Sequence, residues 1–304
     1  MFILTLGVAV LIIIVIIQFL RFIRSDCDLT LQYTQYMGKS PAAALGNKVV
    51  WITGASSGIG EYFAYEMAAA GCKIILSARR EEELNRVKKQ CLLSGPVKDE
   101  DVLVLPLDIL KFDSHKLAVE KALQHFKKID VLVNNAGRSQ RASWFKTELA
   151  VDRELLEVNV LGTLSLTKAV LPYMVERKEG HIVVVSSTAG KLGAPLSGSY
   201  TGTKHALQGW FESLRIEAVE YNIDITMVCP GPVFSNILST AFTEEKDKEF
   251  GGTMSPTDKR VTTDRCASLM AVAVANKLDE VWIALQPILF FMYLFQYCPS
   301  IARK

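Results

Sequence analysis

Paired metal ligands are missing from this sequence. None of its six cysteines stands in a CxxC pair, and its four histidines show neither HxxxH nor HExxH spacing. The cysteines are widely spaced, unlike those of a disulfide framework, and no metal site is expected. Long runs of like charge are also missing, and the formal net charge of the 304 residues is only +2. This balance gives no reason to expect nucleic acid or a polyanion as a partner.

N-x-[ST] sequons are missing too, so no glycosylation signal indicates which side of a membrane the chain faces. Apolar residues, by contrast, are abundant: they make up 50% of the chain, and its mean hydropathy is +0.22. Much of this excess lies in the first twenty residues and in a stretch near the C-terminus.

The run Phe2–Leu20, FILTLGVAVLIIIVIIQFL, has only Thr5 and Gln18 as polar interruptions. As a helix it would span about 28 Å, close to the hydrocarbon thickness of a bilayer. A cleavable signal peptide is the alternative. The run is longer than an ordinary signal core, however, and no Lys or Arg precedes it and no A-x-A site follows. We therefore predict a retained single transmembrane anchor over residues 1–24.

Arg21 and Arg24 follow the run, and positive charge at this end favours a cytosolic body. Residues 25–45 are mostly polar and predict a connector. Residues 46–285 predict one α/β catalytic domain, because about 250 residues suffice for a sheet with helices on both faces. Residues 286–304 form a hydrophobic, aromatic tail that a proline interrupts. Whether this tail is an interfacial segment or a packed terminal helix is left open.

A β–turn–α–β pattern opens the predicted domain. KVVWIT predicts a buried strand, TGASSGIG a glycine-rich turn, EYFAYEMAAAG a helix and KIILSA a second strand. Such a unit places a pyrophosphate over a helix N-terminus, and glycine permits the tight turn and the close approach. An ordinary strand-to-helix turn is the alternative. The residues assigned to the dinucleotide here are Thr53, Gly54, Ser56, Ser57, Gly58, Ile59 and Gly60.

The end of the second predicted strand bears on the choice of cofactor. An acidic residue there would accept hydrogen bonds from the ribose 2′-OH of NAD, whereas an arginine suits the 2′-phosphate of NADP. This sequence has Arg79 and Arg80, and a guanidinium group offers a phosphate a planar, permanently charged fork. Solvated cations at the start of a helix are the alternative. We predict NADP(H) as the cofactor, with Arg79 as the main contact.

The segment HIVVVSSTAGKLGAPLSGSYTGTK combines three residue types that suit carbonyl reduction. An apolar strand delivers Ser187, Tyr200 follows thirteen residues later, and Lys204 four residues after that. Positions i and i+4 share a helix face. Free tyrosine has a pKa of about 10, and a neighbouring ammonium lowers that pKa toward neutrality. We predict Tyr200 as general acid–base and Ser187 as the residue that holds and polarises the substrate oxygen.

The sequence resembles the short-chain dehydrogenase/reductase family in four motifs. They are TGASSGIG, the NNAG that ends a fourth predicted strand, Ser187 with YxxxK, and a later PG. The resemblance covers about residues 46–285 and implies a single Rossmann-type, doubly wound parallel sheet. It implies that Lys204 also bonds the nicotinamide ribose and that Asn159 supports a water relay to this lysine. A purely structural amide is the alternative for Asn159. The resemblance further assigns to the cofactor Asp108, Asn135, Ala136, Gly137, Pro230, Gly231, Val233 and Ser235.

The family includes membrane-bound retinol and hydroxysteroid dehydrogenases, and the resemblance to them implies a function for this chain. We expect an NADP(H)-dependent oxidoreductase in the endoplasmic reticulum membrane. It would reduce carbonyls, or oxidise the alcohols, of hydrophobic substrates such as steroids, retinoids, quinones or dicarbonyls. The alternative is a catalytically silent NADP-binding scaffold on the membrane. Residues 238–263 lack periodicity and are predicted to cover the substrate. The physiological substrate, the reaction direction and the choice between a monomer and a homo-oligomer stay open.

Overall fold

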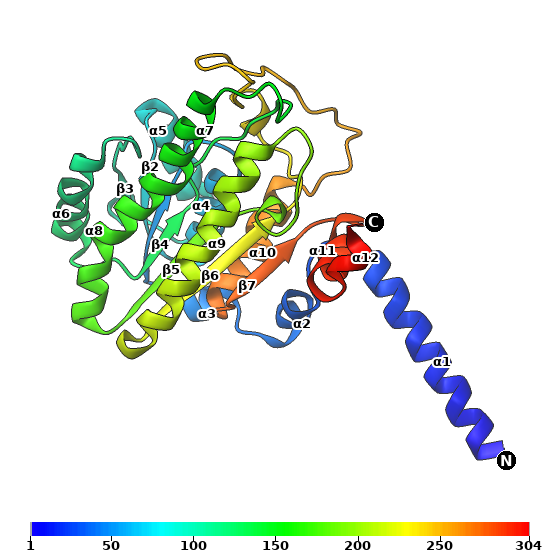
Figure 1. Ribbon diagram of the computed structural model, residues 1–304. Coiled ribbons are helices and arrows are strands. Elements are labelled where there is room, and N and C mark those ends of the chain that lie inside the picture. The colour runs from blue at the N-terminus through cyan, green and yellow to red at the C-terminus, as the bar shows by residue number, and fades with distance from the viewer. Residues whose placement is uncertain (1, 304) are drawn as a thin grey trace.

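A seven-stranded sheet organises the chain in the computed structural model, which describes residues 2–303 (Figure 1). Every neighbouring pair is parallel, and the strand order is β3-β2-β1-β4-β5-β6-β7. The order reverses between β1 and β4, so a crevice opens there at the carboxyl ends of the strands. The strands are β1 (Val49–Thr53), β2 (Lys73–Ser77), β3 (Val102–Val104), β4 (Val131–Asn134), β5 (Gly180–Val185), β6 (Ile223–Pro230) and β7 (Glu280–Ile283).

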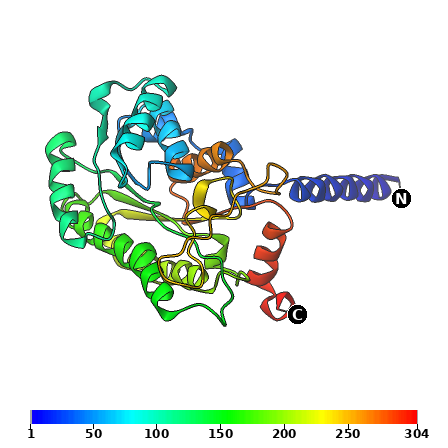
Figure 2. The ribbon, with the colours of Figure 1, turned by 90° about the horizontal axis from the view of Figure 1, so that it is seen from above.

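Helices cover both faces of this sheet. Side chains alternate along a strand, so Val50 and Ile52 join one core cluster while Val49 and Trp51 join the other. Helices α4, α5 and α10 pack on the first face and α6, α8 and α9 on the second. Figure 2 shows α10 in orange and α8–α9 in green on opposite sides of the sheet. The bounds are α4 (Gly58–Ala69), α5 (Glu81–Ser94), α6 (His115–Phe126), α7 (Leu149–Leu156), α8 (Gly162–Arg177), α9 (Gly198–Ala218) and α10 (Thr263–Ala275).

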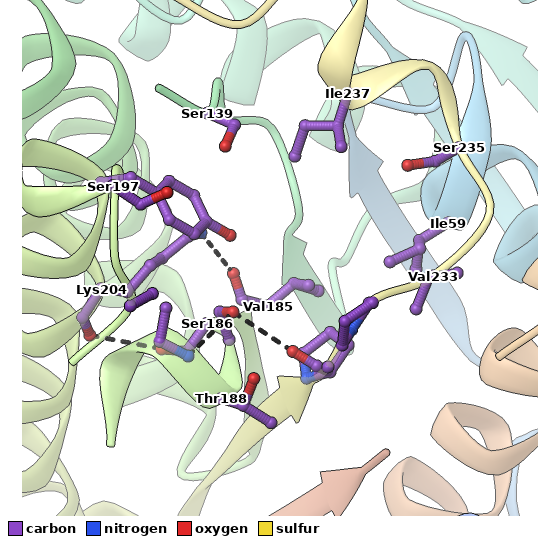
Figure 3. A pocket seen from close by; sticks show the side chains of 18 of the residues that line it. Ile59, Ser139, Val185, Ser186, Thr188, Ser197, Lys204, Val233, Ser235 and Ile237 are labelled. Atoms are coloured by element: carbon purple, nitrogen blue, oxygen red, sulfur yellow. Dashed lines mark hydrogen bonds between the residues drawn. The ribbon is translucent and has the colours of Figure 1, made fainter. Parts of the chain in front are cut away.

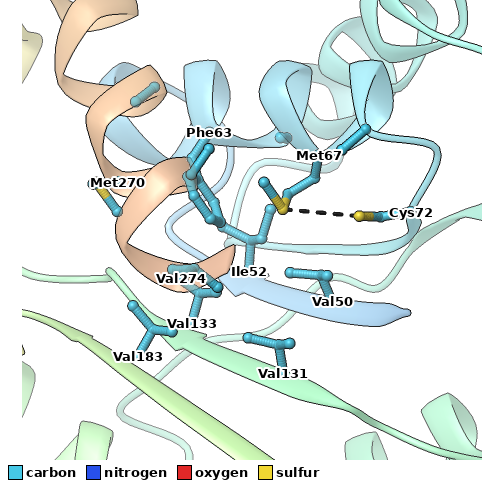
Figure 4. Packing of buried hydrophobic residues seen from close by; sticks show 14 of the residues in the cluster. Val50, Ile52, Phe63, Met67, Cys72, Val131, Val133, Val183, Met270 and Val274 are labelled. Atoms are coloured by element: carbon cyan, nitrogen blue, oxygen red, sulfur yellow. Dashed lines mark hydrogen bonds between the residues drawn. The ribbon is translucent and has the colours of Figure 1, made fainter. Parts of the chain in front are cut away.

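The first-face core joins the opening β–turn–α unit to the C-terminal part of the domain. Ile52 of β1 packs with Phe63 of α4 and with Met270 and Val274 of α10, all of them buried (Figure 4). Strands buried on both faces are rich in Val and Ile, as KVVWIT and IVVVSS are. The prediction of a Rossmann-type parallel sheet is confirmed.

Residues 25–45, which the sequence predicts as a connector, form two short helices, α2 (Leu29–Met37) and α3 (Pro41–Leu45). Asp28 caps α2 by accepting a hydrogen bond from the N–H of Leu31 at 2.9 Å. Its other oxygen accepts from the N–H of Trp282 in β7 at 2.6 Å. Leu31 and Leu45 are buried in the first-face core. This segment is therefore folded onto the domain, because its few apolar side chains fill gaps beside α10.

Helix α1 (Phe2–Ile23) projects away from the domain in both ribbon views (Figures 1 and 2). From Leu11 onward most of its large apolar side chains are exposed. Within the described residues, one continuous helical stretch, Leu149–Arg177, passes a length and composition test for a membrane span. Half of that stretch is buried inside the domain, which is typical of a core helix. The described apolar part of α1, Leu11–Ile23, is shorter than a span, and the anchor stays a prediction.

The C-terminal tail forms α11 (Ile288–Tyr297) and α12 (Pro299–Ala302). Leu289 and Met292 are buried in a small cluster with Trp282 of β7. The Tyr293 hydroxyl accepts a hydrogen bond from the N–H of Leu29 at 2.8 Å, which joins α11 to α2. Of the two alternatives for the tail, the structure shows a packed terminal helix, and the other face of α11 remains exposed.

Candidate active site

The glycine-rich turn after β1 leaves room for a phosphate group. Gly54 and Gly58 have φ angles of +64° and +60°, a region that glycine adopts without strain. A Cβ on Gly60 would lie 2.5 Å from the carbonyl oxygen of Gly54, so only glycine lets the two segments meet. Ser57 precedes α4 without a side-chain cap, which leaves the first N–H groups of the helix available to an anion. The turn thus fits the pyrophosphate of a dinucleotide.

The loop after β4 braces this turn. The Thr53 hydroxyl accepts hydrogen bonds from the N–H of Asn135 at 3.0 Å and of Ala136 at 3.1 Å. Asn135 Nδ2 donates to the carbonyl oxygens of Thr53 at 3.0 Å and Gly54 at 3.3 Å. Asn135 and Gly137 also line the cavity described below. The NNAG motif therefore holds the phosphate turn in place as well as shaping the crevice.

The ends of β2 and β3 form the other end of the crevice. Arg79 is exposed and lines a hollow together with Asp108, whose carboxylate accepts from the N–H of Leu110 at 3.1 Å. Arg80 instead donates from Nη2 to the Ser56 hydroxyl at 3.2 Å. The structure thus brings Arg79 and Asp108 together at the predicted adenosine end and places Arg80 against the phosphate turn.

Ser187, Tyr200 and Lys204 meet at the carboxyl end of β5. Ser187 lies just beyond the strand, and the other two lie one turn apart near the start of α9. Lys204 Nζ donates to the Val185 carbonyl oxygen at 2.8 Å and lies 5.6 Å from the centroid of the Tyr200 ring. Ser187 Oγ donates to the Pro230 carbonyl oxygen at 3.2 Å. All three catalytic candidates line one cavity of about 220 Å³ (Figure 3).

Asn159 lies behind this group, in an irregular turn between α7 and α8. Residues Glu157–Leu161 form a π-helical segment, a feature that often marks a functional site. The Asn159 amide accepts from the N–H of Arg138 at 2.8 Å and donates to the carbonyl oxygen of Arg138 at 2.9 Å. A Cβ on Gly137 would lie 3.0 Å from Asn159 Oδ1 and 3.8 Å from Lys204 Nζ. The amide therefore fixes the loop beside the lysine, and its part in a water relay stays a prediction.

Burial shifts the pKa values of the tyrosine and the lysine in opposite directions. It raises the pKa of Tyr200, and a hydrogen bond to Ser187 and the positive charge of Arg141 oppose this rise. Burial lowers the pKa of Lys204 to about 8, and the neighbouring Cys229 acts in the opposite direction. At pH 7 Lys204 is therefore still mainly a cation. No carboxylate among residues 2–303 forms a salt bridge with it.

The segment after β6 forms one wall of the cavity. Its lining residues are Pro230, Gly231, Val233 and Ser235. In Figure 3, Val233 and Ser235 lie with Ile59 of the phosphate turn on one side. Ser139 and Ser197 lie across the cavity from them, on the side of Lys204. The predicted cofactor residues of this segment thus lie on one side of the cavity, and Ser139, Ser197 and Lys204 lie on the other.

The residues lining this cavity that the sequence does not assign to the site include Ser139, Arg141, Ser197, Ile237, Leu238 and Arg260. Ser139 and Arg141 follow NNAG closely, which is the only signal the sequence offers for them. Leu238 and Arg260 belong to the segment 238–263 that the sequence predicts to cover the substrate. The structure places these two residues at the cavity, and closure of the segment on binding stays a prediction.

A family model described as short chain dehydrogenase matches residues 48–246. The chain belongs to the short-chain dehydrogenase/reductase family, as the motifs predict. It is an oxidoreductase that uses a nicotinamide dinucleotide, and its glycine turn fits that group.

Its relatives include dehydrogenase/reductase SDR family member 7 of Homo sapiens, 49% identical over 288 residues that cover 94% of this chain and 85% of the relative. Member 7B of Mus musculus is 38% identical over 238 residues, covering 78% and 72%. The combination of LSARR, CPGPV and EVWIALQP with the predicted anchor predicts a likeness to member seven, and this likeness is confirmed.

Two solved structures share the fold. One is an alcohol dehydrogenase from Thermococcus sibiricus complexed with 5-hydroxy-NADP, with a TM-score of 0.68, 25% identity and coverage of 79% of this chain and 97% of that one. The other is a short chain dehydrogenase/reductase from Burkholderia phymatum in complex with NAD, with a TM-score of 0.72, 25% identity and coverage of 86% and 97%. One holds an NADP derivative and the other NAD, so the likeness leaves the choice of cofactor open.

Lys204→Met should stabilise the cofactor-free protein. The folded-state pKa of about 8 lies below the value of about 10.4 for an unfolded lysine, so keeping the buried amine protonated opposes folding below pH 8. That penalty fades as the pH rises from about 8 to about 10.4. At pH 7 we expect the free energy of unfolding to rise by on the order of a few kcal/mol, and the gain to shrink at pH 9.5. Urea denaturation at the two pH values measures both.

The matched control is Lys168→Met, which removes an exposed cation from α8 and should change stability little at either pH. A gain in Lys204→Met that is equal at pH 7 and pH 9.5 would show that the substitution acts through packing and not through the proton.

Proposed function

We propose that this protein reduces carbonyl groups, or oxidises the corresponding alcohols, of hydrophobic substrates with NADP(H). The observation that carries the proposal is the meeting of Ser187, Tyr200 and Lys204 in one cavity beside the glycine turn. The lining of that cavity includes the apolar Ala194, Ile237 and Leu238. These walls favour an apolar carbonyl compound such as a steroid, retinoid, quinone or dicarbonyl.

Each side chain of the group has a role in this reaction. Bound NADPH supplies the hydride to the carbonyl carbon, and the protein must supply a proton to the oxygen. Ser187 holds and polarises that oxygen, and Tyr200 donates the proton. The Lys204 cation favours the phenolate that remains and binds the nicotinamide ribose. The products are the alcohol and NADP⁺, and in the oxidative direction the same tyrosine accepts the proton.

Tyr200→Phe tests the proposal directly. The change removes one hydroxyl and keeps the ring, so folding and NADPH binding should survive. Turnover should fall by about 10²–10⁴-fold, the usual contribution of general acid–base catalysis. Single-turnover reduction of a reactive dicarbonyl measures the rate, and NADPH fluorescence measures cofactor affinity. Lys204→Met should lose both turnover and affinity.

Normal turnover in folded, NADPH-bound Tyr200→Phe protein would remove the tyrosine from the mechanism. Absence of turnover in the wild type, over a panel of dicarbonyls, quinones, steroids and retinal, would instead support the alternative of a silent NADP-binding scaffold.

The proposed preference for NADP(H) over NAD(H) is based on Arg79, which follows the end of β2. Arg79 is exposed beside Asp108, so its guanidinium can contact a ribose 2′-phosphate without displacing a protein partner. An acidic residue at this point would repel that phosphate. The position of Arg79 supports NADP(H), and Arg80 against Ser56 adds positive charge near the phosphates.

Arg79→Asp should therefore reverse the cofactor preference. Losing a charge-assisted contact of about 1.5–3 kcal/mol should weaken NADPH binding by about 10–100-fold and improve NADH relative to it. Titration of both cofactors measures the ratio of affinities. Lys89→Asp makes the same charge change at an exposed site on α5 and should leave the ratio unchanged. The assignment of Arg79 is wrong if wild type prefers NADH or if Arg79→Asp keeps the wild-type ratio.

We also propose that α1 anchors the protein in the endoplasmic reticulum membrane with the domain in the cytosol. The α1 side chains from Leu11 to Leu20 are mostly apolar and exposed, as a lipid-facing helix requires. The base of α1 contacts the C-terminal tail, since Gln286 Nε2 donates to the Phe22 carbonyl oxygen at 3.0 Å. Exposed Phe290 and Phe291 on α11 suit the membrane–water interface beside this junction.

The full-length protein should resist alkaline carbonate extraction and retain its N-terminal residues. Protease added to sealed microsomes should digest the domain, because Arg21 and Arg24 favour the cytosolic side. N-terminal sequencing that starts near Ser25 would identify a cleaved signal peptide instead. Protection of the domain from protease would place it in the lumen.

A further inference from the structure

Arg141 is held rigidly at the substrate side of the cavity. Its backbone N–H donates to the Phe242 carbonyl oxygen at 2.8 Å. Its Nη1 donates to Ser139 Oγ at 3.0 Å, to the Gln140 carbonyl oxygen at 2.8 Å and to Ser197 Oγ at 2.6 Å. Three acceptors on one nitrogen fix the plane of the guanidinium group, so little side-chain entropy remains to be lost on binding a ligand.

The opposite edge of this guanidinium is free. Across residues 2–303, no acceptor forms a hydrogen bond with Nε or Nη2 of Arg141, and no carboxylate forms a salt bridge with it. The Nε–Nη2 edge is the fork that binds a carboxylate with two parallel hydrogen bonds. Arg138 and Arg260 nearby are different, because Glu249 and Asp258 already pair with them at 2.8 and 2.9 Å.

The charged residues that line the cavity also favour an anionic ligand. Its lining includes Lys204, Arg141 and Arg260 but no Asp or Glu. Burial lowers the pKa of Arg141, Tyr200 opposes this shift, and the charge of Arg260 acts in the same direction as burial, yet a guanidinium stays charged at neutral pH. A half-buried cation without a counter-charge is costly, and an anionic ligand would remove that cost.

The cofactor does not account for this cation. Figure 3 shows Ser139 and Ser197, which hold the guanidinium, across the cavity from Ile59 of the phosphate turn. The turn has its own donors at the start of α4, and the predicted 2′-phosphate contact, Arg79, lines a different hollow. Arg141 lines the cavity and is not claimed by the predicted cofactor contacts, so it is available to the substrate.

We propose that Arg141 binds a carboxylate on the substrate, so that the preferred substrates are apolar oxo acids, in which the reacting carbonyl and the carboxylate are separated by an apolar chain or ring. This inference rests on the proposed carbonyl reduction and narrows its substrate class. Ser187 and Tyr200 receive the carbonyl oxygen, Ile237 and Leu238 contact the apolar part, and the guanidinium fork receives the carboxylate. A membrane-anchored enzyme suits such amphiphilic compounds, because they concentrate at the bilayer surface.

The test compares an acid with its neutral ester. The probes are 4-benzoylbutyrate and its methyl ester, reduced at saturating NADPH by the full chain in detergent. Wild type should favour the acid in kcat/KM by at least tenfold. Arg141→Met should lower the acid-to-ester ratio by about 10–100-fold, the range expected for a charge-assisted bidentate contact. Arg141→Lys should recover only part of it, because an ammonium lacks the fork. Lys146→Met removes an exposed cation from the same loop and should leave the ratio unchanged.

A second readout does not depend on turnover. The acid should raise the melting temperature of NADP⁺-loaded wild type, and this shift should be lost in NADP⁺-loaded Arg141→Met. Equal kcat/KM for acid and ester, or an equal loss of both in Arg141→Met, would overturn the inference while the proposed carbonyl reduction stands. If no carbonyl compound is reduced, carbonyl reduction fails as the function, and the thermal shift alone decides whether Arg141 is a carboxylate site.

Discussion

The buried amine of Lys204 is the constraint on which the site depends. A cation inside a protein is unfavourable, and this one has a backbone carbonyl oxygen, that of Val185, as its neighbour at 2.8 Å. The free energy to hold it there comes from the two hydrophobic cores on either side of the sheet. The same burial that opposes folding brings the lysine pKa to about 8 and keeps its charge close to the tyrosine ring. The buried cation thus lowers the stability of the protein at a residue that the proposed reaction needs as a desolvated charge.

The loop after β4 connects the parts of the site to one another. Asn135 binds the phosphate turn, and the backbone of Arg138 binds Asn159 in the π-helical turn. The Arg138 side chain pairs with Glu249 in the segment predicted to cover the substrate, while Arg141 binds Ser197 just before α9. One short loop thus links the cofactor turn, the helix that carries the tyrosine and the substrate segment.

The α1 end of the molecule is joined to the sheet by hydrogen bonds and an ion pair. Asp28 caps α2 with one carboxylate oxygen and accepts from the β7 backbone with the other. Arg265 of α10 pairs with Asp26 at 2.7 Å, and Tyr293 of α11 binds the start of α2. The segment between α1 and the domain is therefore held against the domain at several points along its length.

The sequence by itself determined the features that local chemistry controls. TGASSGIG between an apolar strand and a helix specifies a phosphate turn, because only glycine adopts its φ angles and allows the close contact at Gly60. The spacing of Tyr200 and Lys204 places them on one helix face whatever the rest of the chain does. Short apolar runs rich in β-branched residues identify the strands, and the family motifs then indicate a doubly wound parallel sheet.

Only the tertiary structure decided what depends on contacts between distant segments. Leu31 and Leu45 looked like parts of a polar connector, and their burial follows from the gap beside α10. Nothing local marks Arg141 as different from Arg138. Arg141 lines the cavity without a carboxylate partner among the described residues, whereas Arg138 pairs with Glu249, more than a hundred residues away. The downward shift of the lysine pKa likewise comes from burial. The burial of a side chain and its choice of partner depend on how the whole chain packs, so they cannot be predicted from a short stretch of sequence.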